Sequence, residues 1–558
     1  MSNTVNVAGL SFTLANPTTT RKFGPRIGSA VFRRPNGAEL TIETPGMLAS
    51  SSRGVIPHLS RDHHNLTKAI RWVHIPFETF LEHSPPVPTL QAGKNPLHTF
   101  LGFLPSQHIL SMSIRDPHDG KGMPSNGNAH VCASSLRGVR KISPSTWRSH
   151  VGACQPDIAI ALSDTPFTDP PYSQKRLTKS IERSVQWLAD ILQPVEEPAL
   201  RPNIFVHMSG ATSIPARRAF SESLTEILHG READSVKPFR CLDEGVSGYT
   251  FNLVPLRLSL DASIRPVPED QHDIPPTIDS RDPLPTRNTR HADQIIPLLQ
   301  ASLISLPTSK TRLINSARSP HEILLFIQNI GVDLFDAHWA QRAADIGIAL
   351  DFRFPVTEHA RGKASTKLGK EIPTNGKRNI GHNLYHNDYT LDFTSLGGDS
   401  FVGSYDDRAN MATQDICLCA ACSPAIPRTR IAHGNDPNEA SSIIPEEAPP
   451  RYRPPYTRAY VHHLLHTHEM TAHSLLVMHN ISVLDAFFAG VRRVVAEKGE
   501  QEFIEEVKVF ESTYDGNLAV FDEARVMWRN VEMARGKGRL AREKAKQEES
   551  TLGTAVEL

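Results

Sequence analysis

Three cysteines within six residues carry the clearest chemistry in this sequence. The segment Cys417-Leu418-Cys419-Ala420-Ala421-Cys422 holds three of the 6 cysteines in the chain. Soft thiolates that converge from one tight loop, completed by one imidazole, form the ligand set of a tetrahedral structural zinc site. The simpler interpretation is a group of ordinary buried thiols, which would not explain why they are concentrated in one window. We therefore predict one structural zinc ion per chain.

The fourth ligand must come from another part of the chain, and spacing alone leaves seven candidates. All are histidines downstream of the cysteines: His433, His462, His463, His466, His468, His473 and His479. A single histidine on a helix is more often a surface or core residue than a ligand, so most of these have other roles. A closed site with four protein ligands stabilises structure and does not activate water. The predicted role of the metal is to hold the C-terminal helices to the rest of the chain.

The elements that must position this site alternate in character from about residue 60 to residue 350. Short apolar runs occur at 157–162, 203–207 and 311–314, and segments of helical periodicity at 177–192, 216–229, 295–304 and 320–330. Such alternation is typical of βα units around a parallel sheet, and the number of units suits a barrel. Before it, short strands are expected, with a loop motif at 44–48 and 53–59.

Three stretches interrupt the pattern, at about 266–293, 361–378 and 423–455. The first is poor in large apolar residues and is predicted to be disordered, and the third is too rich in proline for a helix or a central strand. The second is either a solvated loop or a loop that contacts phosphate, through Lys363, Lys367, Lys370, Lys377 and Arg378. The predicted domains are a barrel at 1–410, a zinc-binding subdomain at 411–515 and a charged helix or tail at 516–558.

The composition limits the function classes. The 558 residues include 60 Lys and Arg against 60 Asp and Glu, so a protein that grips nucleic acid over its whole surface is disfavoured, and any such contact should be local or shared with a partner. The other cysteines are scattered and no secretory segment precedes them, which predicts a reducing compartment without disulfides. No apolar run approaches the length of about 18 residues that a helix needs to span a bilayer. We expect a soluble, cytoplasmic protein, with peripheral association with an organelle surface left open.

The cysteine motif belongs to a larger set of residues that resembles a known family. Together with Tyr456-Thr457-Arg458-Ala459-Tyr460-Val461-His462-His463-Leu464 and His479-Asn480, it resembles the zinc subdomain of tRNA-guanine (queuine) transglycosylases, as does Gly331-Val332-Asp333-Leu334-Phe335-Asp336. The segments 44–48 and 53–59 look most like the accessory, non-catalytic subunits of that family. The resemblance spans about residues 5–500. It implies an α/β fold, a TIM-like (β/α)8 barrel with an inserted zinc-binding subdomain and C-terminal helices, and it selects His479 as the fourth metal ligand.

The resemblance also implies a reaction, the exchange of wobble guanine in tRNA for queuine, which needs one nucleophilic aspartate and a second aspartate for proton transfer. Asp336 stands at the nucleophile position, but Ala337-His338-Trp339-Ala340-Gln341-Arg342 replaces the segment that follows it in catalytic members. The second aspartate is expected within 129–138, which contains no acidic residue, and the base-reading segment is replaced at 207–211. The resemblance implies a further aspartate that hydrogen-bonds the purine edge. Asp164 is the candidate, but it lies one residue short of the family spacing. We predict no catalytic residue, with Asp336 vestigial.

The resemblance therefore predicts a non-catalytic subunit of the tRNA-guanine transglycosylase heterodimer. Such a subunit would supply a dimer interface to the catalytic queuine tRNA-ribosyltransferase subunit and would support tRNA through the complex. The segments His462–His473 and Val483–Val495 are the interface candidates, although packing against their own barrel would explain them equally well. Two alternatives remain at this point. One is an active transglycosylase with a remodelled pocket that uses Asp336, and the other is a zinc-stabilised barrel scaffold unrelated to tRNA.

Overall fold

The chain divides into two compact units. The first holds residues 1–57, 69–339 and 487–511, and the second holds residues 58–68, 340–486 and 512–558. The computed structural model describes residues 9–15, 21–34, 37–166, 170–194, 202–264, 291–357, 376–401, 416–426 and 452–532. The predicted domain boundary at residue 410 and most of the three predicted insertions lie outside these residues, so they stay predictions.

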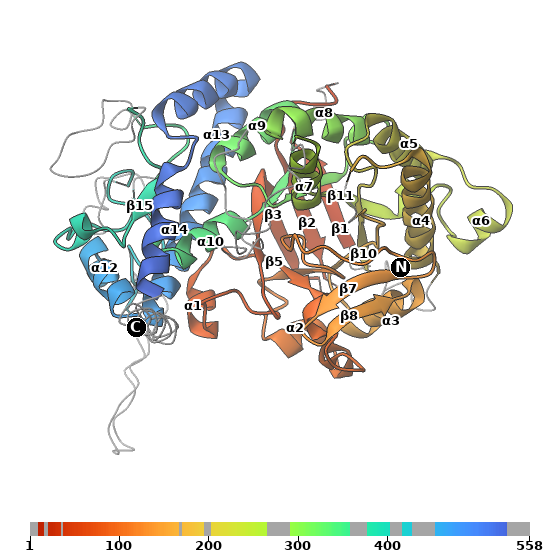
Figure 1. Ribbon diagram of the computed structural model, residues 1–558, viewed down its shortest axis with the longest axis horizontal. Coiled ribbons are helices and arrows are strands. Elements are labelled where there is room, and N and C mark those ends of the chain that lie inside the picture. Colours follow the sequence, from red (N-terminus) through yellow and green to blue (C-terminus); the bar gives the residue numbers. More distant parts are fainter. Residues whose placement is uncertain are drawn as a thin grey trace, which may run out of the picture. The chain divides into compact units, whose positions relative to one another are not determined.

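Eight parallel strands close into a barrel in the first unit (Figure 1). In barrel order from β4 they are β4 (Gly46–Ser50), β5 (Trp72–Pro76), β6 (Ile109–Ser113), β9 (Ile158–Ile160), β10 (Asn203–His207), β11 (Val246–Asn252), β12 (Thr311–Asn315) and β13 (Leu334–Asp336). β13 pairs with β4, which closes the ring. The predicted α/β barrel is confirmed, and the predicted strands at 157–162, 203–207 and 311–314 coincide with β9, β10 and β12.

One sequence prediction was wrong at the start of the barrel. The segment 44–48 was expected to be part of a loop motif, but residues 46–50 form β4, whose five residues are all buried. A strand buried on both faces shows no alternation of polar and apolar residues, and the preceding Pro45-Gly46 pair has the appearance of a turn. The alternation by which a strand is usually recognised in a sequence is therefore absent from β4.

Helices follow the strands around the outside of the barrel (Figure 1). Those of the first unit are α2 (Pro96–Leu101), α3 (Pro144–Cys154), α4 (Gln174–Leu192), α5 (Ile214–Thr225), α6 (Gly230–Ser235), α7 (Leu253–Ile264), α8 (Ala292–Leu303) and α9 (Pro320–Ile330). Helices α3, α4, α5, α8 and α9 contact one another in sequence, so they form a continuous outer layer. The hairpin β7 (Val131–Ser135) and β8 (Gly138–Ile142) is a separate two-stranded sheet.

An antiparallel sheet of β1 (Gly9–Leu14), β2 (Gly28–Arg33) and β3 (Glu39–Thr44) covers one end of the barrel. Its side chains Phe32 and Leu40 share one buried cluster with residues at the amino ends of the barrel strands, such as Trp72 and Ile109. Because this cluster fills the end where the strands begin, functional groups are expected at the opposite end, where the strands finish.

The second unit contains β14 (Ile348–Leu350) paired with β15 (Gly381–Asn383), and the helices α1 (Arg61–Leu66), α12 (Arg458–His466) and α14 (Ala519–Glu532). The helix α10 (His338–Asp345) and the long α13 (Met470–Thr513) contribute residues to both units. Gly499, with φ 81°, interrupts α13 and separates the two predicted helices at 483–496 and 501–512.

Helix α13 is also long and apolar enough to cross a membrane, since it contains an 18-residue window of mean hydropathy 1.5. No apolar run of this length was expected from the sequence. Of that window, 78% is buried within the chain, as in the core helix of a folded protein.

Candidate metal centre and barrel mouth

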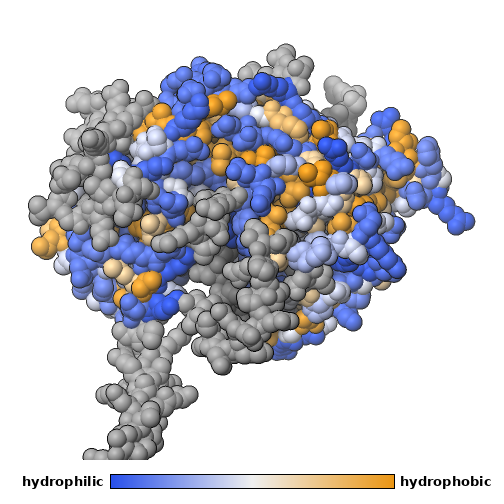
Figure 2. All heavy atoms as spheres, turned by 45° about the horizontal axis from the view of Figure 1, so that its top comes forward, coloured by the Kyte–Doolittle hydropathy of each residue, from blue (hydrophilic) through white to orange (hydrophobic). Residues whose placement is uncertain are grey.

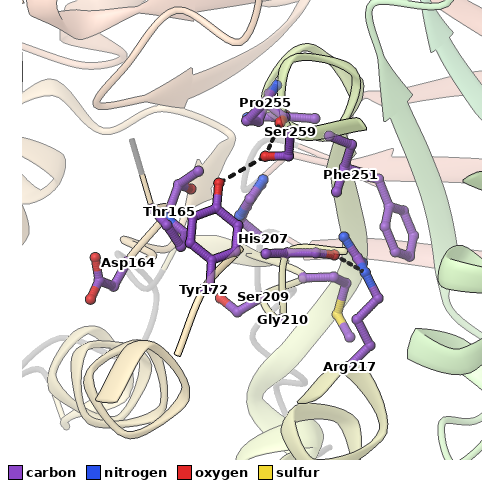
Figure 3. A pocket seen from close by; sticks show the side chains of 15 residues that line it. Asp164, Thr165, Tyr172, His207, Ser209, Gly210, Arg217, Phe251, Pro255 and Ser259 are labelled. Carbon is purple, nitrogen blue, oxygen red and sulfur yellow. Dashed lines mark hydrogen bonds between the residues drawn. The ribbon is translucent and has the colours of Figure 1, made fainter. Parts of the chain in front are cut away.

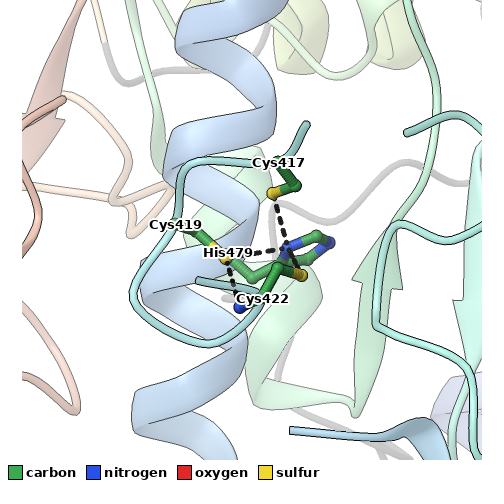
Figure 4. A group of neighbouring side chains, drawn as sticks. All are labelled: Cys417, Cys419, Cys422 and His479. Carbon is green, nitrogen blue, oxygen red and sulfur yellow. Dashed lines mark hydrogen bonds between the residues drawn. The ribbon is translucent and has the colours of Figure 1, made fainter. Parts of the chain in front are cut away.

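The four residues selected as metal ligands meet in the second unit (Figure 4). The Nδ1 atom of His479 lies 3.6 Å from Sγ of Cys417, 3.4 Å from Sγ of Cys419 and 3.6 Å from Sγ of Cys422. A tetrahedral zinc with ordinary Zn–S and Zn–N bonds holds sulfur and nitrogen about 3.5 Å apart. The four donor atoms therefore have the separations that one metal ion requires.

The surroundings of His479 orient its ring for this role. The Nε2 atom lies 2.8 Å from the carbonyl oxygen of Leu350, so an Nε2–H donates there and Nδ1 faces the sulfurs with its lone pair. The next residue, Asn480, accepts a hydrogen bond from the amide of Leu350 and donates to the carbonyl of Ile348, each at 2.9 Å. The His479-Asn480 pair thus attaches α13 to β14. A Cβ at Gly397 would lie 3.2 Å from the His479 ring, so a side chain there would crowd it.

The thiols perturb one another strongly. Hydrogen bonds that Cys417 donates to Cys419 and Cys422 raise the pKa of Cys417, while hydrogen bonds with Cys417 and Cys419 lower the pKa of Cys422. Cys417, Cys419 and His479 are buried, and Cys422 is half-buried. Such a buried set of donors can hold a metal ion.

The other candidate histidines have different partners. His462 lies 2.9 Å from the carbonyl oxygen of Leu384 through Nδ1, and His473 lies 3.0 Å from that of Ala344. His463 is exposed on α12, and His433 lies outside the described residues. Among the described histidines in this list, only His479 joins the cysteines.

A buried arginine lies in the same unit as the metal centre, and no role for it was predicted from the sequence. Arg458, at the start of α12, donates to Oδ2 of Asp351 at 2.9 Å and lies 3.5 Å from Asp399. His382 also contacts Oδ2 of Asp351, at 2.9 Å. Burial alone would raise the pKa of Asp351, but the hydrogen bond from His382 and the charge of Arg458 bring it to about 2. Asp351, His382 and Asp399 could also hold a metal. Because Arg458 already neutralises them, we interpret them as an ion-pair network.

At the barrel mouth, Asp336 ends β13 and is completely buried. Its Oδ2 accepts a hydrogen bond from the amide of Ser316, and its Oδ1 accepts one from the amide of His338 at 3.0 Å. The rings of His118 and His338 stack at 3.9 Å, and Nδ1 of His118 lies 3.9 Å from Oδ2. Burial raises the pKa of Asp336 and lowers that of His118. The carboxylate is thus enclosed by its own chain.

The residues after Asp336 also differ from the expected loop. They form α10 from His338 onward, and Trp339 is buried with 3% of its surface exposed. Trp339 is therefore a core residue of this helix.

Asp164, the candidate for the aspartate that contacts the base, is bound by two arginines. Arg176 and Arg183 each donate to its Oδ2 at 2.9 Å, and Asn126 donates to its Oδ1 at 2.8 Å. Burial would raise the pKa of Asp164, but these hydrogen bonds and charges lower it. The carboxylate points away from the other labelled residues in Figure 3. Its hydrogen-bonding capacity is used within the chain.

The segment in which the second aspartate was expected lies at the barrel mouth and contains no acidic residue. Residues 131–142 form the β7–β8 hairpin, and its Val131 and Ser134 line the cavity at the barrel mouth. Two carboxylates do lie there, Glu78 after β5 and Asp116 after β6. Burial raises the pKa of Glu78 to about 7 and that of Asp116 to about 6. Both oxygens of Glu78 accept backbone hydrogen bonds, from Asp116 at 2.7 Å and Ser134 at 2.9 Å. Their positions at strand ends, visible once strands are assigned, were the signal that sequence reasoning missed.

The segment 207–211, at the end of β10, lines a cavity that opens to solvent (Figure 3). His207 also lines the neighbouring cavity that contains Glu78 and Asp116. Burial, followed by the charges of Arg217 and Arg115, lowers the pKa of His207 to about 3, so its ring is neutral. The barrel mouth therefore retains hollows but presents a different set of groups from a catalytic aspartate pair.

The predicted tRNA-contacting residues are described only in part. Lys363, Lys367 and Lys370 lie outside the described residues. Lys377 and Arg378 are half-buried, and the backbone of Arg378 pairs with that of Thr513 at 2.8 Å and Asp515 at 2.7 Å. Contact with tRNA through this segment stays a prediction.

The two interface candidates differ in exposure. In Val483–Val495 the large apolar side chains up to Val494 are buried, and Phe488 stacks on Phe335 within the first unit. In α12, Tyr460 is 42% exposed and stacks on Tyr456. The adjoining segment exposes Phe393 by 71% and Leu391 by 76%. Exposed hydrophobic residues also occur in small groups between hydrophilic ones on the face shown in Figure 2, so exposure alone does not identify an interface.

Comparison with known proteins gives one consistent result. A family model described as queuine tRNA-ribosyltransferase matches residues 23–237 and 448–512. The chain is 24% identical to queuine tRNA-ribosyltransferase accessory subunit 2 of Schizosaccharomyces pombe, over 86% of this chain and 82% of that protein. It is 26% identical to the Xenopus tropicalis protein of the same name, over 85% and 94%, and 23% identical to the Homo sapiens protein, over 82% and 90%.

Proposed function

Because the chain belongs to the queuine tRNA-ribosyltransferase family, we propose that it is the non-catalytic accessory subunit of a heterodimer that exchanges wobble guanine for queuine in tRNA. The alignments with the relatives named accessory subunit 2 include most of this chain and most of each relative. The enzyme activity would then belong to a second, catalytic subunit.

The enclosure of Asp336 is the observation that carries the non-catalytic assignment. A nucleophilic carboxylate must reach the ribose carbon, but Asp336 is fully buried, and each of its oxygens is held by a backbone hydrogen bond. Opening this site would leave the amides of Ser316 and His338 without partners, at a cost of about 1–3 kcal/mol each. Asp336 fits better as a residue that fixes the ends of β12 and β13.

The donor set at Cys417, Cys419, Cys422 and His479 supports zinc as the metal. Three thiolates and one imidazole with tetrahedral separations are typical of structural zinc, and no position of the set is left for water. When bound, the ion would connect the cysteine loop to α13, and through Asn480 to β14. Metal analysis of the purified, reduced chain should find about one equivalent of zinc, and less than about half an equivalent would contradict the assignment.

The exposed side of α12 is the surface we propose for the catalytic partner. Backbone hydrogen bonds from Arg458 to Thr394 (3.0 Å) and from Ala459 to Asp392 (2.8 Å) hold the 391–394 segment beside the first turn of α12. Exposed aromatic residues of this kind are enriched in protein interfaces. The buried Val483–Val495 segment is not available for such a contact, so the proposed surface consists of Leu391, Phe393, Tyr456 and Tyr460.

Reconstitution tests the function. The chain alone, the catalytic subunit alone and their mixture are assayed for incorporation of labelled guanine into a tRNA with a wobble guanine. We expect activity in the mixture and little or none in the chain alone. Exchange by the chain alone, lost on Asp336→Ala, would identify it as an active transglycosylase. No difference between the mixture and the catalytic subunit would show a scaffold without a role in the reaction.

The proposed surface has its own test. Phe393→Asp and Tyr460→Glu should each weaken the complex, by about 30-fold or more if they are interface hot spots. Leu136→Glu, which changes an exposed leucine of the first unit, is the matched control. The affinity of the chain for the catalytic subunit is measured by sedimentation or calorimetry. If it is unchanged in both variants, the interface lies on another surface.

A further inference from the structure

Arg217 is a buried cation without a counter-ion. It belongs to α5, only 2% of its surface is exposed, and none of the described carboxylates pairs with it. Burial lowers its pKa to about 10, so it remains charged at neutral pH. An uncompensated buried charge is costly, and buried charges in proteins are normally paired. The four other buried arginines among the residues that the structure describes are Arg34, Arg257, Arg312 and Arg458. Arg34, Arg257 and Arg458 pair with carboxylates. Arg312 donates to two backbone carbonyls, and although burial lowers its pKa, the charge of Asp333 raises it, whereas no described carboxylate acts on Arg217 in this way.

The position of Arg217 on its helix increases this imbalance. It lies in the first turn of α5, whose N-cap is Ser213, and the partial positive charge of a helix N-terminus disfavours a cation there. Gly210 approaches this turn so closely that a Cβ would lie 2.7 Å from the Arg217 amide nitrogen. The backbone around Arg217 is therefore closely packed. The N-terminus of α5 adds to the positive potential at the guanidinium and does not compensate its charge.

The guanidinium lines the cavity after β10 (Figure 3). Its Nε donates to the carbonyl of Ala211 at 2.6 Å and its Nη1 donates to Ser302 at 2.9 Å. A guanidinium has five N–H donors, so these two bonds leave donors for another group. A planar fork of this kind binds carboxylate or phosphate oxygens especially well.

A second polar group in this cavity also lacks a partner. Nε2 of His207 is buried and has no hydrogen-bond partner in the described part of the chain, whereas Nδ1 lies 2.7 Å from Oγ of Ser163. If Ser163 donates to Nδ1, the neutral ring carries its proton on Nε2, where it can donate to an anion. Asp164, the carboxylate of this cavity, is already neutralised by Arg176 and Arg183.

We propose that this cavity is a binding site for a small organic anion, whose carboxylate or phosphate oxygens contact Arg217 and His207. The apolar part of such a ligand would lie against Phe251, Pro255 and Leu256, which line the same cavity. The hydroxyls of Tyr172 and Ser259, 2.8 Å apart, add a polar edge. The site belongs to this chain alone and does not depend on the proposed subunit function.

Binding of three matched probes to the full-length chain tests the site: phenyl phosphate, benzoate and the uncharged benzamide. Isothermal titration at constant ionic strength should show saturable binding of at least one of the two anions, with benzamide at least about tenfold weaker, since one charge-assisted hydrogen bond accounts for that factor. The stronger of the two anions identifies the acidic group. Equal binding of benzamide, or no saturable binding of either anion, would overturn the proposal.

Variants assign the binding to these residues. Arg217→Gln should weaken the preferred anion by at least about tenfold, and Arg218→Gln, which changes the exposed neighbour on α5, should leave it unchanged. His207→Phe, which keeps a ring but removes Nε2, tests the site with Arg217 intact and should also weaken binding. Unchanged affinity in both Arg217→Gln and His207→Phe would contradict the assignment. If Arg217→Gln does not fold, the His207→Phe result decides.

Discussion

The metal centre and the barrel mouth both gather ionisable side chains, but these are satisfied in different ways. At the metal centre, three sulfurs and Nδ1 of His479 face one another at metal-binding separations. The other ring nitrogen of His479, Nε2, donates to the backbone carbonyl of Leu350. At the mouth, Asp336 accepts two backbone hydrogen bonds and Asp164 is bound by two arginines. A metal can complete the first set, whereas Asp336 and Asp164 are held by groups of their own chain.

Under the proposed function, this difference explains how the fold can persist in a subunit that does not perform the reaction. A structural metal needs only that its ligands converge, and the same contacts that bring them together also stabilise the protein. A reaction needs groups that remain unsatisfied until substrate binds, and such groups cost stability. In the proposed heterodimer the chemistry belongs to another subunit, so the barrel mouth can hold carboxylates such as Asp336 and Asp164 within its own chain, while the metal ligands must remain.

Removing a metal ligand should have the largest effect. In His479→Ala the site loses its nitrogen donor, and because metal binding and folding are coupled, we expect loss of bound zinc and unfolding of the second unit. Zinc content and thermal unfolding of the purified variant provide the measurement. His463→Ala, on the exposed side of α12, serves as the control and should retain both. A full equivalent of zinc in His479→Ala would mean that a different donor completes the site.

The ion-pair network beside the metal centre should have the next largest effect. Asp351→Asn leaves Arg458 buried without its nearest carboxylate, at a cost of about 3–5 kcal/mol in the free energy of unfolding. The pKa of Asp351 in the folded chain, about 2, is below its ordinary value of 3.8, so its contribution is present above pH 4 and is lost as the pH falls toward 2. Chemical denaturation at several pH values measures this, with the exposed Glu469→Gln as control. A loss below 1 kcal/mol would show that the network is not stabilising.

Glu78 should show the opposite dependence on pH. Burial raises its pKa in the folded chain from 4.5 to about 7, so its contribution is full at acidic pH and is lost as the pH rises through 7. Relative to wild type, Glu78→Gln should become more stable between pH 5 and pH 8, by up to about 3 kcal/mol. The comparison uses the difference between the two proteins at each pH, with Glu82→Gln as control. A difference that does not change with pH would mean that Glu78 is ionised throughout.

Local patterns in the sequence were enough to predict the barrel and the three clustered cysteines, whereas spacing left seven candidates for the fourth ligand. Helix α9 was predicted with its observed bounds, and the His479-Asn480 pair came from the family resemblance. The role of Arg458 could not be predicted, because its carboxylate partners are distant in sequence and meet it only in the folded chain. The enclosure of Asp336 depends in the same way on His118, 218 residues upstream, and on the amide of Ser316. Residue types indicate which groups are present, but only tertiary contacts show whether those groups remain available.

The smallest effect on the reaction should come from Asp336→Asn. The amide can accept only one of the two backbone hydrogen bonds, so we expect a loss of stability of about 1–3 kcal/mol. Exchange of guanine by the reconstituted heterodimer should nevertheless stay within about twofold of wild type, because the barrier for a step that does not involve Asp336 is unaffected. The measurement is the initial rate at a temperature where both proteins are folded, with the equivalent change in the catalytic subunit as the positive control. A rate reduced by 100-fold or more in the folded variant would mean that the enclosed carboxylate opens during the reaction, and the contrast between the two regions would no longer hold.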